Sequence, residues 1–278
     1  MFEKELLSTK RILVTGGGSG LGKEMSRSFL QLGAEVIICG RREDVLLNTK
    51  TELHKETGGK IECIKLDIRD PKAVETSISQ LFSTKPINCL INNAAGNFLS
   101  RTEDLSYRAM DAIIAIVLHG TSYVTLECGK HWLKKNISGN VVSIVTTYAW
   151  TGSGYVVPSA MAKAGVLAMT RSLASEWGPK GIRLNAIAPG PFPTEGAWSR
   201  LFPRDDFVSV FETRNPMGRV GKKQELNDLA AFLIADQSTF INGEVITIDG
   251  GEWLKGAGAF NFASALTEED WIEMKKRK

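Results

Sequence analysis

Residues 15–22 read Thr15-Gly16-Gly17-Gly18-Ser19-Gly20-Leu21-Gly22, and this glycine-rich turn decides the fold. It follows a short apolar run, Arg11–Thr15, and opens a segment of helical period, Gly20–Leu32. Glycine allows positive φ and close backbone approach, and a helix start offers free N–H groups and partial positive charge to a pyrophosphate. One such turn can serve packing alone, but five glycines in seven residues at the first strand–helix junction favour a dinucleotide-binding site.

Short β-rich runs alternate with longer helical segments, and this order predicts βαβ units with a parallel sheet between two helical layers. The expected strands are Arg11–Thr15, Glu35–Gly40, Ile61–Leu66, Ile87–Ile91, Asn140–Val145, Ile182–Ala188 and Glu244–Asp249. The expected helices are Gly20–Leu32, Val45–Thr57, Pro71–Phe82, Leu105–Lys135, Pro158–Trp177 and Gln224–Ala235. We therefore predict an α/β fold with one doubly wound, seven-stranded parallel sheet in three layers.

The length of 278 residues allows one or two domains, at roughly 100–200 residues per domain. No internal repeat, low-complexity block or Pro/Ser-rich linker interrupts the series of elements. Only 27 residues follow Gly251, which is too few for a second domain. We predict a single domain over residues 1–278, in which 252–278 form a C-terminal tail ending in a short helix whose charges suit its dipole.

Charge and composition narrow the class of protein. Lys plus Arg number 34 and Asp plus Glu 31, so the net charge of +3 does not indicate a nucleic-acid-binding protein. A hydrophobic share of 43% and a charged share of 23% are typical of an ordinary globular protein. No apolar run approaches the roughly 20 residues of a membrane span. The first residues, MFEKELLSTKR, lack the order of a secretion signal or a transit peptide.

The cysteines and histidines indicate neither disulfides nor a metal site. The four cysteines contain no CxxC pair, and three of them lie in or beside short apolar runs. We expect reduced packing residues in a cytoplasmic protein. The three histidines, His54, His119 and His131, lack metal-ligand spacing.

The end of the second expected strand indicates which nucleotide binds. A nucleotide fold that selects NAD normally places an acidic residue there, against the ribose 2′-hydroxyl. This chain has Arg41 and Arg42 instead, and a guanidinium pairs with phosphate oxygens in a bidentate way. The arginines favour NADP(H), and Asp67, after the third strand, would accept from the adenine amino group.

Three further blocks follow later strands: Asn92-Asn93-Ala94-Ala95-Gly96, Pro189-Gly190-Pro191-Phe192-Pro193-Thr194 and Asp249-Gly250-Gly251. With the glycine-rich turn, and in this order, they resemble the short-chain dehydrogenase/reductase family over about nine-tenths of the chain. The resemblance implies a Rossmann-like domain and a homodimer or homotetramer. It implies cofactor contacts from Gly16, Gly18, Ser19, Gly20, Leu21, Gly22, Asn93, Ala94, Gly96, Lys163, Pro189, Gly190, Phe192 and Thr194.

The chain departs from the usual catalytic pattern of that family. Most members carry a catalytic Tyr four residues before a catalytic Lys, with a Ser or Thr at the end of the preceding strand. Here Lys163 fits the lysine, but the position four residues earlier is Ser159. Thr146 takes the strand-end position, and His119 replaces a helical Asn that often completes the proton relay. The usual relay for carbonyl reduction is therefore incomplete.

Two tyrosines could substitute for the absent one. Tyr155 lies eight residues before Lys163, and Tyr148 lies fifteen before it. We favour Tyr148, because it closely follows a strand end, where open α/β sheets deliver side chains into the ligand crevice.

The offset of this tyrosine points to one branch of the family. Tyr148, Ser159 and Lys163, together with Asn97 and Phe98, resemble the 2,4-dienoyl-CoA reductase branch. The stretch 191–200 resembles the acyl-CoA lid of that branch. The resemblance implies an NADPH-dependent oxidoreductase that acts on CH–CH groups in the β-oxidation of unsaturated fatty acids.

Reduction of a conjugated dienoyl thioester places hydride on the carbon δ to the carbonyl, and negative charge collects on the thioester oxygen. Hydrogen-bond donors must then point at that oxygen. We expect Tyr148 and Asn97 to be these donors, Lys163 to hold the nicotinamide ribose and lower the Tyr pKa, and Ser159 to orient cofactor or substrate.

For the acyl-CoA substrate, the resemblance implies contacts from Arg41, Arg69, Phe98, Ser106 and Arg200. Two alternatives stay open: a carbonyl reductase for 3-oxoacyl or other substrates that uses Tyr155, and a non-catalytic dinucleotide-binding protein. His119, inside an apolar run, is more typical of a packed histidine than of a ligand.

Overall fold

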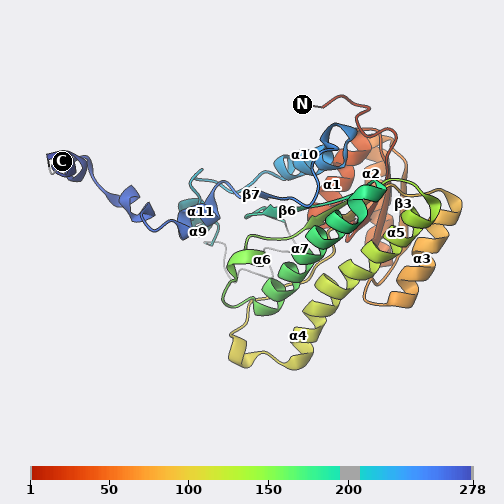
Figure 1. Cartoon of the computed structure of the whole chain (residues 1–278), viewed down its shortest axis with the longest axis horizontal. Coiled ribbons are helices and arrows are strands. Elements are labelled where there is room, and N and C mark those ends of the chain that lie inside the picture. The colour runs from red at the N-terminus through yellow and green to blue at the C-terminus, as the bar shows by residue number, and fades with distance from the viewer. Residues whose placement is uncertain (1, 195–206, 277–278) are drawn as a thin grey trace.

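In the computed structural model, which describes residues 2–194 and 207–276, a twisted parallel sheet lies between two layers of helices (Figure 1). Within the described residues the strand order is β3-β2-β1-β4-β5-β6-β7, and every neighbouring pair is parallel. The strands are β1 (Arg11–Thr15), β2 (Glu35–Gly40), β3 (Ile61–Lys65), β4 (Cys89–Asn92), β5 (Gly139–Ile144), β6 (Ile182–Pro189) and β7 (Val245–Ile248). The predicted α/β fold is confirmed.

The helices form the outer layers. One layer contains α1 (Gly20–Gln31), α2 (Glu43–Thr57) and α10 (Lys223–Ile234), and the other contains α3 (Pro71–Thr84), α5 (Thr121–Lys135) and α7 (Val157–Trp177). The shorter helices are α4 (Tyr107–Ile114), α6 (Tyr148–Thr151), α9 (Phe207–Arg214), α11 (Glu252–Ala257) and α12 (Glu268–Lys276).

The central strands are buried on both faces, as parallel strands under two helical layers must be. In β1, Ile12 and Val14 join the core on one side and Leu13 joins the core on the other, and all three are fully buried. In the neighbouring strand, burial raises the pKa of the Cys39 thiol to about 12. Cys39, Cys89 and Cys128 are buried, as expected of packing residues, and Cys63 is half-buried.

Most expected boundaries move by one or two residues, and side-chain hydrogen bonds explain two of these differences. The fourth strand starts at Cys89 rather than Ile87, whose carbonyl accepts from the indole Nε1 of Trp132 (2.7 Å). The long helix expected from Leu105 starts at Tyr107, because the Oγ of Ser106 accepts from the backbone N of Ala109 (3.1 Å) and caps the helix.

Residues 107–135 form one long helical stretch that is apolar enough, by length and composition, to cross a membrane. A core helix of a globular protein passes the same test of length and composition. A π-helical turn, Ala115–Gly120, joins its two α-helical parts. Val124, Cys128 and Trp132 are fully buried on the sheet and α3, so its second half is one of the core helices of the fold.

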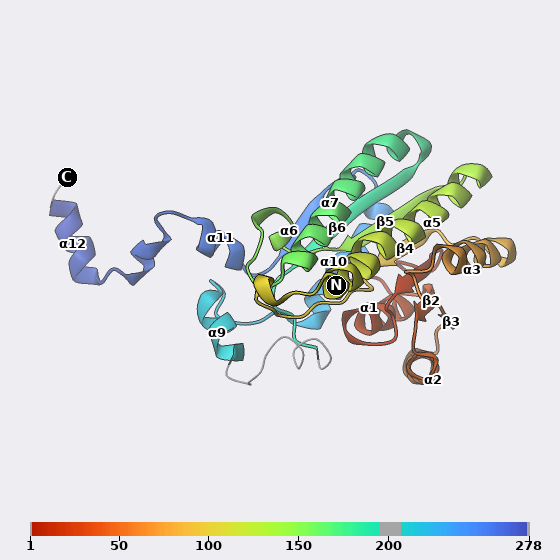
Figure 2. The ribbon, with the colours of Figure 1, turned by 90° about the horizontal axis from the view of Figure 1, so that it is seen from below.

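The C-terminal tail leaves the domain beyond α11, and α12 lies far from the sheet (Figure 2). Phe260 and Phe262 are 80% and 67% exposed. The expected short helix is present, with acidic residues in its first turn and lysines in its last.

Candidate active site

The carboxyl ends of β1, β4, β5 and β6 meet at one edge of the sheet, and the loops that follow them form the candidate site. The strand order reverses between β1 and β4, and ligands of open α/β sheets bind at such a switch point. The fourth sequence block, Asp249–Gly251, follows β7 at the same edge, so all four blocks come together there although more than 220 residues separate the first from the last.

The glycine-rich turn has the geometry of a phosphate cradle. Gly16 and Gly20 have φ angles of 66° and 55°, which favour glycine. A Cβ at Gly22 would lie 2.5 Å from the Nδ2 of Asn93, so no side chain fits there. Ser19 occupies the N-cap of α1 without a side-chain cap bond, which leaves helix N–H groups for an anion. This backbone fits the pyrophosphate of a dinucleotide.

A hydroxyl from β1 ties the second block to this turn. The Oγ1 of Thr15 accepts from the backbone N of both Asn93 and Ala94, at 3.0 Å each. The Asn93 amide in turn donates to the Thr15 carbonyl at 3.0 Å. The structure thus places Asn93 and Ala94 directly beside the turn.

The nucleotide-selecting residues lie at the ends of β2 and β3. Arg41 and Arg42 are exposed to solvent. The guanidinium of Arg69 donates two hydrogen bonds to the carboxylate of Asp67, from Nε to Oδ1 at 2.9 Å and from Nη2 to Oδ2 at 2.5 Å. Hydrogen bonds from Arg69, with the charge of Arg41 as a smaller cause, hold the pKa of Asp67 below its usual value. Arg69 is therefore paired with Asp67 in this structure, and the pair lies near Arg41.

Tyr148, Ser159 and Asn97 come together as a hydrogen-bonded cluster. The Tyr148 hydroxyl lies 3.0 Å from the Oγ of Ser159 and accepts from the Nδ2 of Asn97 at 3.4 Å. The Oδ1 of Asn97 accepts from the backbone N of Phe98 (3.0 Å), which turns the amide NH₂ toward the phenol. The structure thus brings together three of the four predicted catalytic residues by direct contact.

Lys163 lies one helical turn beyond Ser159 on α7 and is buried. Its Nζ donates to the backbone carbonyl of Ile144, the last residue of β5. Burial lowers the pKa of the Lys163 ammonium to about 8. The lysine is therefore held against the end of the central sheet, beside the tyrosine cluster.

Thr146 lies between the end of β5 and Tyr148. Its Oγ1 is buried and has no hydrogen-bond partner among the described residues. A buried hydroxyl left in this state costs free energy that a bound ligand can recover. The orphaned hydroxyl is therefore a second sign, besides the glycine cradle, that this edge of the sheet receives a ligand.

The structure separates the two candidate tyrosines. Tyr155 lies on the turn before α7, with a φ of 66°, and its side chain is 64% exposed. Tyr148, by contrast, reaches Ser159 from the one-turn helix α6. The geometry thus favours Tyr148 as the acid or donor of this site.

His119 lies in the π-helical turn that joins α4 to α5, and its ring stacks near that of Tyr123, with centroids 6.1 Å apart. The sequence identified His119 as a departure but gave no sign of the π-turn. Gly120, the last residue of this turn, lies close to Ile68, because a Cβ there would be 2.6 Å from the Cγ1 of Ile68.

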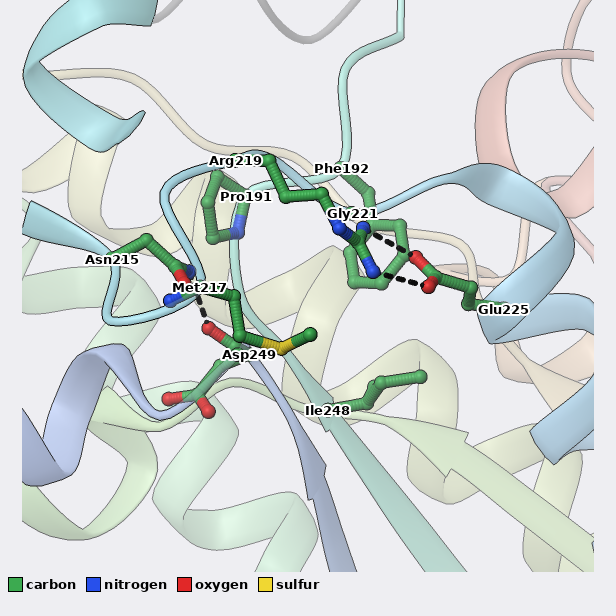
Figure 3. A pocket seen from close by; sticks show the side chains of 10 residues that line it. Pro191, Phe192, Asn215, Met217, Arg219, Gly221, Glu225, Ile248 and Asp249 are labelled. Atoms are coloured by element: carbon green, nitrogen blue, oxygen red, sulfur yellow. Dashed lines mark hydrogen bonds and ion pairs between the residues drawn. The ribbon is translucent and has the colours of Figure 1, made fainter. Parts of the chain in front are cut away.

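The loop after β6, residues 189–194, closes another side of the site. Gly190 packs against Asp249, since a Cβ at Gly190 would lie 2.7 Å from the Asp249 Cβ. Phe192 is buried against Gly221, and a cavity of about 130 Å³ lies beside it (Figure 3). Neither Tyr148, Ser159 nor Lys163 lines this cavity, so it is not where we place the reacting substrate.

Four of the expected substrate contacts lie in the described residues. Arg41 and Arg69 lie in the loops after β2 and β3. Phe98 packs against the cluster of Ile113, Val117 and Ala162. The Ser106 hydroxyl caps α4. Arg200 lies outside the described residues.

The fold and the site define a nucleotide-dependent oxidoreductase, and comparison with known proteins agrees. The model of a family described as enoyl-(acyl carrier protein) reductase matches residues 16–252. The chain belongs to the short-chain dehydrogenase/reductase family.

The relatives narrow the class further. A probable 2,4-dienoyl-CoA reductase [(3E)-enoyl-CoA-producing] of Caenorhabditis elegans is 43% identical, covering 95% of this chain and 88% of that protein. A probable 2,4-dienoyl-CoA reductase [(2E)-enoyl-CoA-producing] of Bacillus subtilis is 40% identical, covering 89% and 98%. The crystal structure of a short-chain dehydrogenase from Bacillus anthracis is 41% identical, covers 88% and 97%, and superposes with a TM-score of 0.80.

Proposed function

We propose that the protein is an NADPH-dependent 2,4-dienoyl-CoA reductase that removes a conjugated double bond during β-oxidation of unsaturated fatty acids. The contact of the Tyr148 hydroxyl with Ser159 and Asn97 carries this proposal. It replaces the Tyr–Lys pair that carbonyl reduction uses with a cluster of hydrogen-bond donors. The named relatives support the substrate class.

Different residues at this edge of the sheet would bind different parts of the cofactor. The turn 16–22 would hold the pyrophosphate, Arg41 and Arg42 the 2′-phosphate, and Lys163 the nicotinamide ribose. The bound nicotinamide supplies the hydride. The exposed guanidinium groups of Arg41 and Arg42, which stand directly after β2 where an NAD-selecting fold has an acidic residue, support NADPH over NADH.

Tyr148 and Asn97 stabilise the negative charge that develops on the thioester oxygen. Each donor is a neutral N–H or O–H group, and a well-placed donor lowers such a barrier by about 2.7–4 kcal/mol. Asn97 already has its amide oriented by Phe98, so little reorganisation is needed when the substrate binds. The carbon proton is then supplied by water.

Ser159 and Lys163 support the phenol from α7. Ser159 is 1% exposed, so its hydroxyl is fixed by packing and fixes the phenol in turn. Lys163 lies one turn beyond Ser159 on α7, so its ammonium group is on the side of the helix from which Ser159 contacts the phenol.

A substrate panel tests the proposal. The purified protein is given NADPH with a 2,4-dienoyl-CoA, a 2-enoyl-CoA or a 3-oxoacyl-CoA, and NADPH consumption is followed. We expect turnover of the dienoyl-CoA and identify the product as a 2-enoyl or 3-enoyl ester by NMR. Turnover of the 3-oxo ester alone would identify a carbonyl reductase, and tight NADPH binding without any consumption would identify a binding protein. Either result would reject the proposal.

A further inference from the structure

A pair of tryptophans joins the catalytic tyrosine's helix to the C-terminal segment. The indole rings of Trp150, on α6, and Trp253, on α11, lie edge to face, with centroids 5.8 Å apart and an angle of 84°. This is a favoured geometry for aromatic pairs, with a contribution of about 0.5–1.5 kcal/mol beyond the area they bury. Trp150 follows Tyr148 by two residues, so the two side chains leave α6 on opposite sides.

The helix α6 is too short to be stable by itself and depends on contacts with the rest of the fold. It is a single turn of four residues without a side-chain N-cap, and it ends at Gly152, which has a φ of 69°. Residues 152–155 beyond it are all exposed. Single turns do not persist without tertiary contacts. The side chains that hold α6 include Ala149 in the core, Tyr148 against Ser159 and Asn97, and Trp150 against Trp253.

Trp253, in turn, is fixed by the sheet. Asp249, directly after β7, accepts from the backbone N of Gly251 (2.8 Å) and of Trp253 (3.0 Å). Its own backbone carbonyl accepts from the Nδ2 of Asn215 (2.7 Å), the contact drawn in Figure 3. Asp249 is 8% exposed, so this anchor is sheltered from solvent.

The same short helix holds the end of α9. The Oε1 of Glu252 lies 3.9 Å from the Nε of Arg214. The Nζ of Lys255 donates to the carbonyl of Thr213 (3.1 Å). The segment 249–255 thus contacts the sheet end, α9 and α6 together.

We infer that Trp150 and Trp253 are positioning residues: their contact sets the angle of α6 and with it the place of the Tyr148 hydroxyl, so the C-terminal segment takes part in catalysis without touching substrate. The inference rests on the proposed role of Tyr148. A displacement of the phenol by about 1 Å is enough to lower the rate of the chemical step by roughly 10²-fold.

A double-mutant cycle tests the inference. W150A, W253A and the double variant are compared with W271A, the same substitution at a 40%-exposed tryptophan on α12. We expect kcat to fall by about 10- to 100-fold in each single variant, and no further in the double variant, because either change removes the same contact. The Kd of NADPH, read from its fluorescence, and the activity of W271A stay within about twofold of the unmodified values. W253F, which keeps an aromatic ring, restores most of kcat.

Additive losses in the double variant, or a kcat within about twofold in both single variants, would overturn the inference. An equal loss in NADPH affinity would also overturn it, since this would indicate general damage rather than a misplaced phenol. The variants are compared on whichever ester of the panel the unmodified enzyme reduces. Failure of the proposed function therefore shows in the unmodified enzyme, and failure of the positioning role shows in the variants.

Discussion

The hydroxyl of Tyr148 lies 3.0 Å from the Oγ of Ser159, although eleven residues separate them along the chain. Ser159 is one helical turn before Lys163 on α7, where most family members place their tyrosine. The phenol thus approaches that helical position from outside it, on the separate helix α6. A tyrosine delivered in this way leaves Ser159 as a hydrogen-bond partner and adds Asn97 as another.

Replacing Tyr148 by Phe removes one donor to the thioester oxygen. We expect kcat on the dienoyl-CoA to fall by about 10²–10³-fold, the loss typical of one oxyanion-hole donor, while the Kd of NADPH stays the same. The control is Y155F, which changes the exposed tyrosine. An equal loss in Y155F alone would move the assignment to Tyr155.

The rate of reduction should depend on whether the side chain at position 97 donates a hydrogen bond or carries a negative charge. N97A removes an amide donor, so kcat should fall by about 10²-fold. N97D should be slower still, because a carboxylate cannot donate and repels the developing oxyanion. Single-turnover rates with bound NADPH measure the effect on chemistry directly. An N97D enzyme faster than N97A would contradict a donor role.

The two arginines after β2 should set cofactor preference. The double variant R41A/R42A should lose about 10²- to 10⁴-fold in kcat/KM for NADPH, because charged contacts to phosphate contribute about 1.5–3 kcal/mol each. Its kcat/KM for NADH should change little, since NADH lacks the 2′-phosphate. R171A, at an exposed arginine on α7, is the control. Parallel losses for both cofactors would contradict selection by these residues.

Burial lowers the pKa of Lys163 from 10.5 to about 8, and this shift predicts how the free energy of unfolding changes with pH. Below pH 8 the folded and unfolded chains both hold the proton, so folding bears the full cost of burying the charge. Between about pH 8 and 10.5 the unfolded chain binds more protons, so the contribution of Lys163 to the free energy of unfolding rises with pH.

The variant K163M isolates this effect. It should be more stable than the unmodified protein at about pH 7, and the difference should shrink by about pH 9.5, as measured by urea unfolding. It should also be inactive at both pH values, because the ribose contact is lost. A difference in stability that does not change with pH would show that burial of charge is not its cause.

Much of the fold followed from the sequence because local signals agreed with the burial pattern. The strands β1 and β2 begin and end at the expected residues, since both are short apolar runs bounded by turn residues. The long helix was harder, because periodicity over residues 105–135 does not distinguish an α-turn from a π-turn. Its exact start depended on the Ser106 cap.

The site was partly predictable for the same reason. Tyr148, Asn97 and Ser159 were proposed together from their spacing and resemblance, and the structure brings the three side chains into contact, while their catalytic roles stay predictions. The Asp67–Arg69 pair was not expected, because two side chains with separate assigned roles can bind each other in the folded chain. The Trp150–Trp253 pair joins residues about a hundred positions apart, and no local pattern indicates such a contact.

Lys163 and Tyr148 are held by different parts of the fold, since Lys163 donates to the carbonyl of Ile144 at the end of β5 and Tyr148 lies on the short helix α6. The lysine is fixed to the central sheet, so the half of the site that serves the cofactor is as rigid as the fold itself. The tyrosine sits on a single turn outside the sheet, attached by a few side chains. An ancestral protein could therefore acquire a new substrate by moving its phenol to another short segment while the older cofactor half stayed intact.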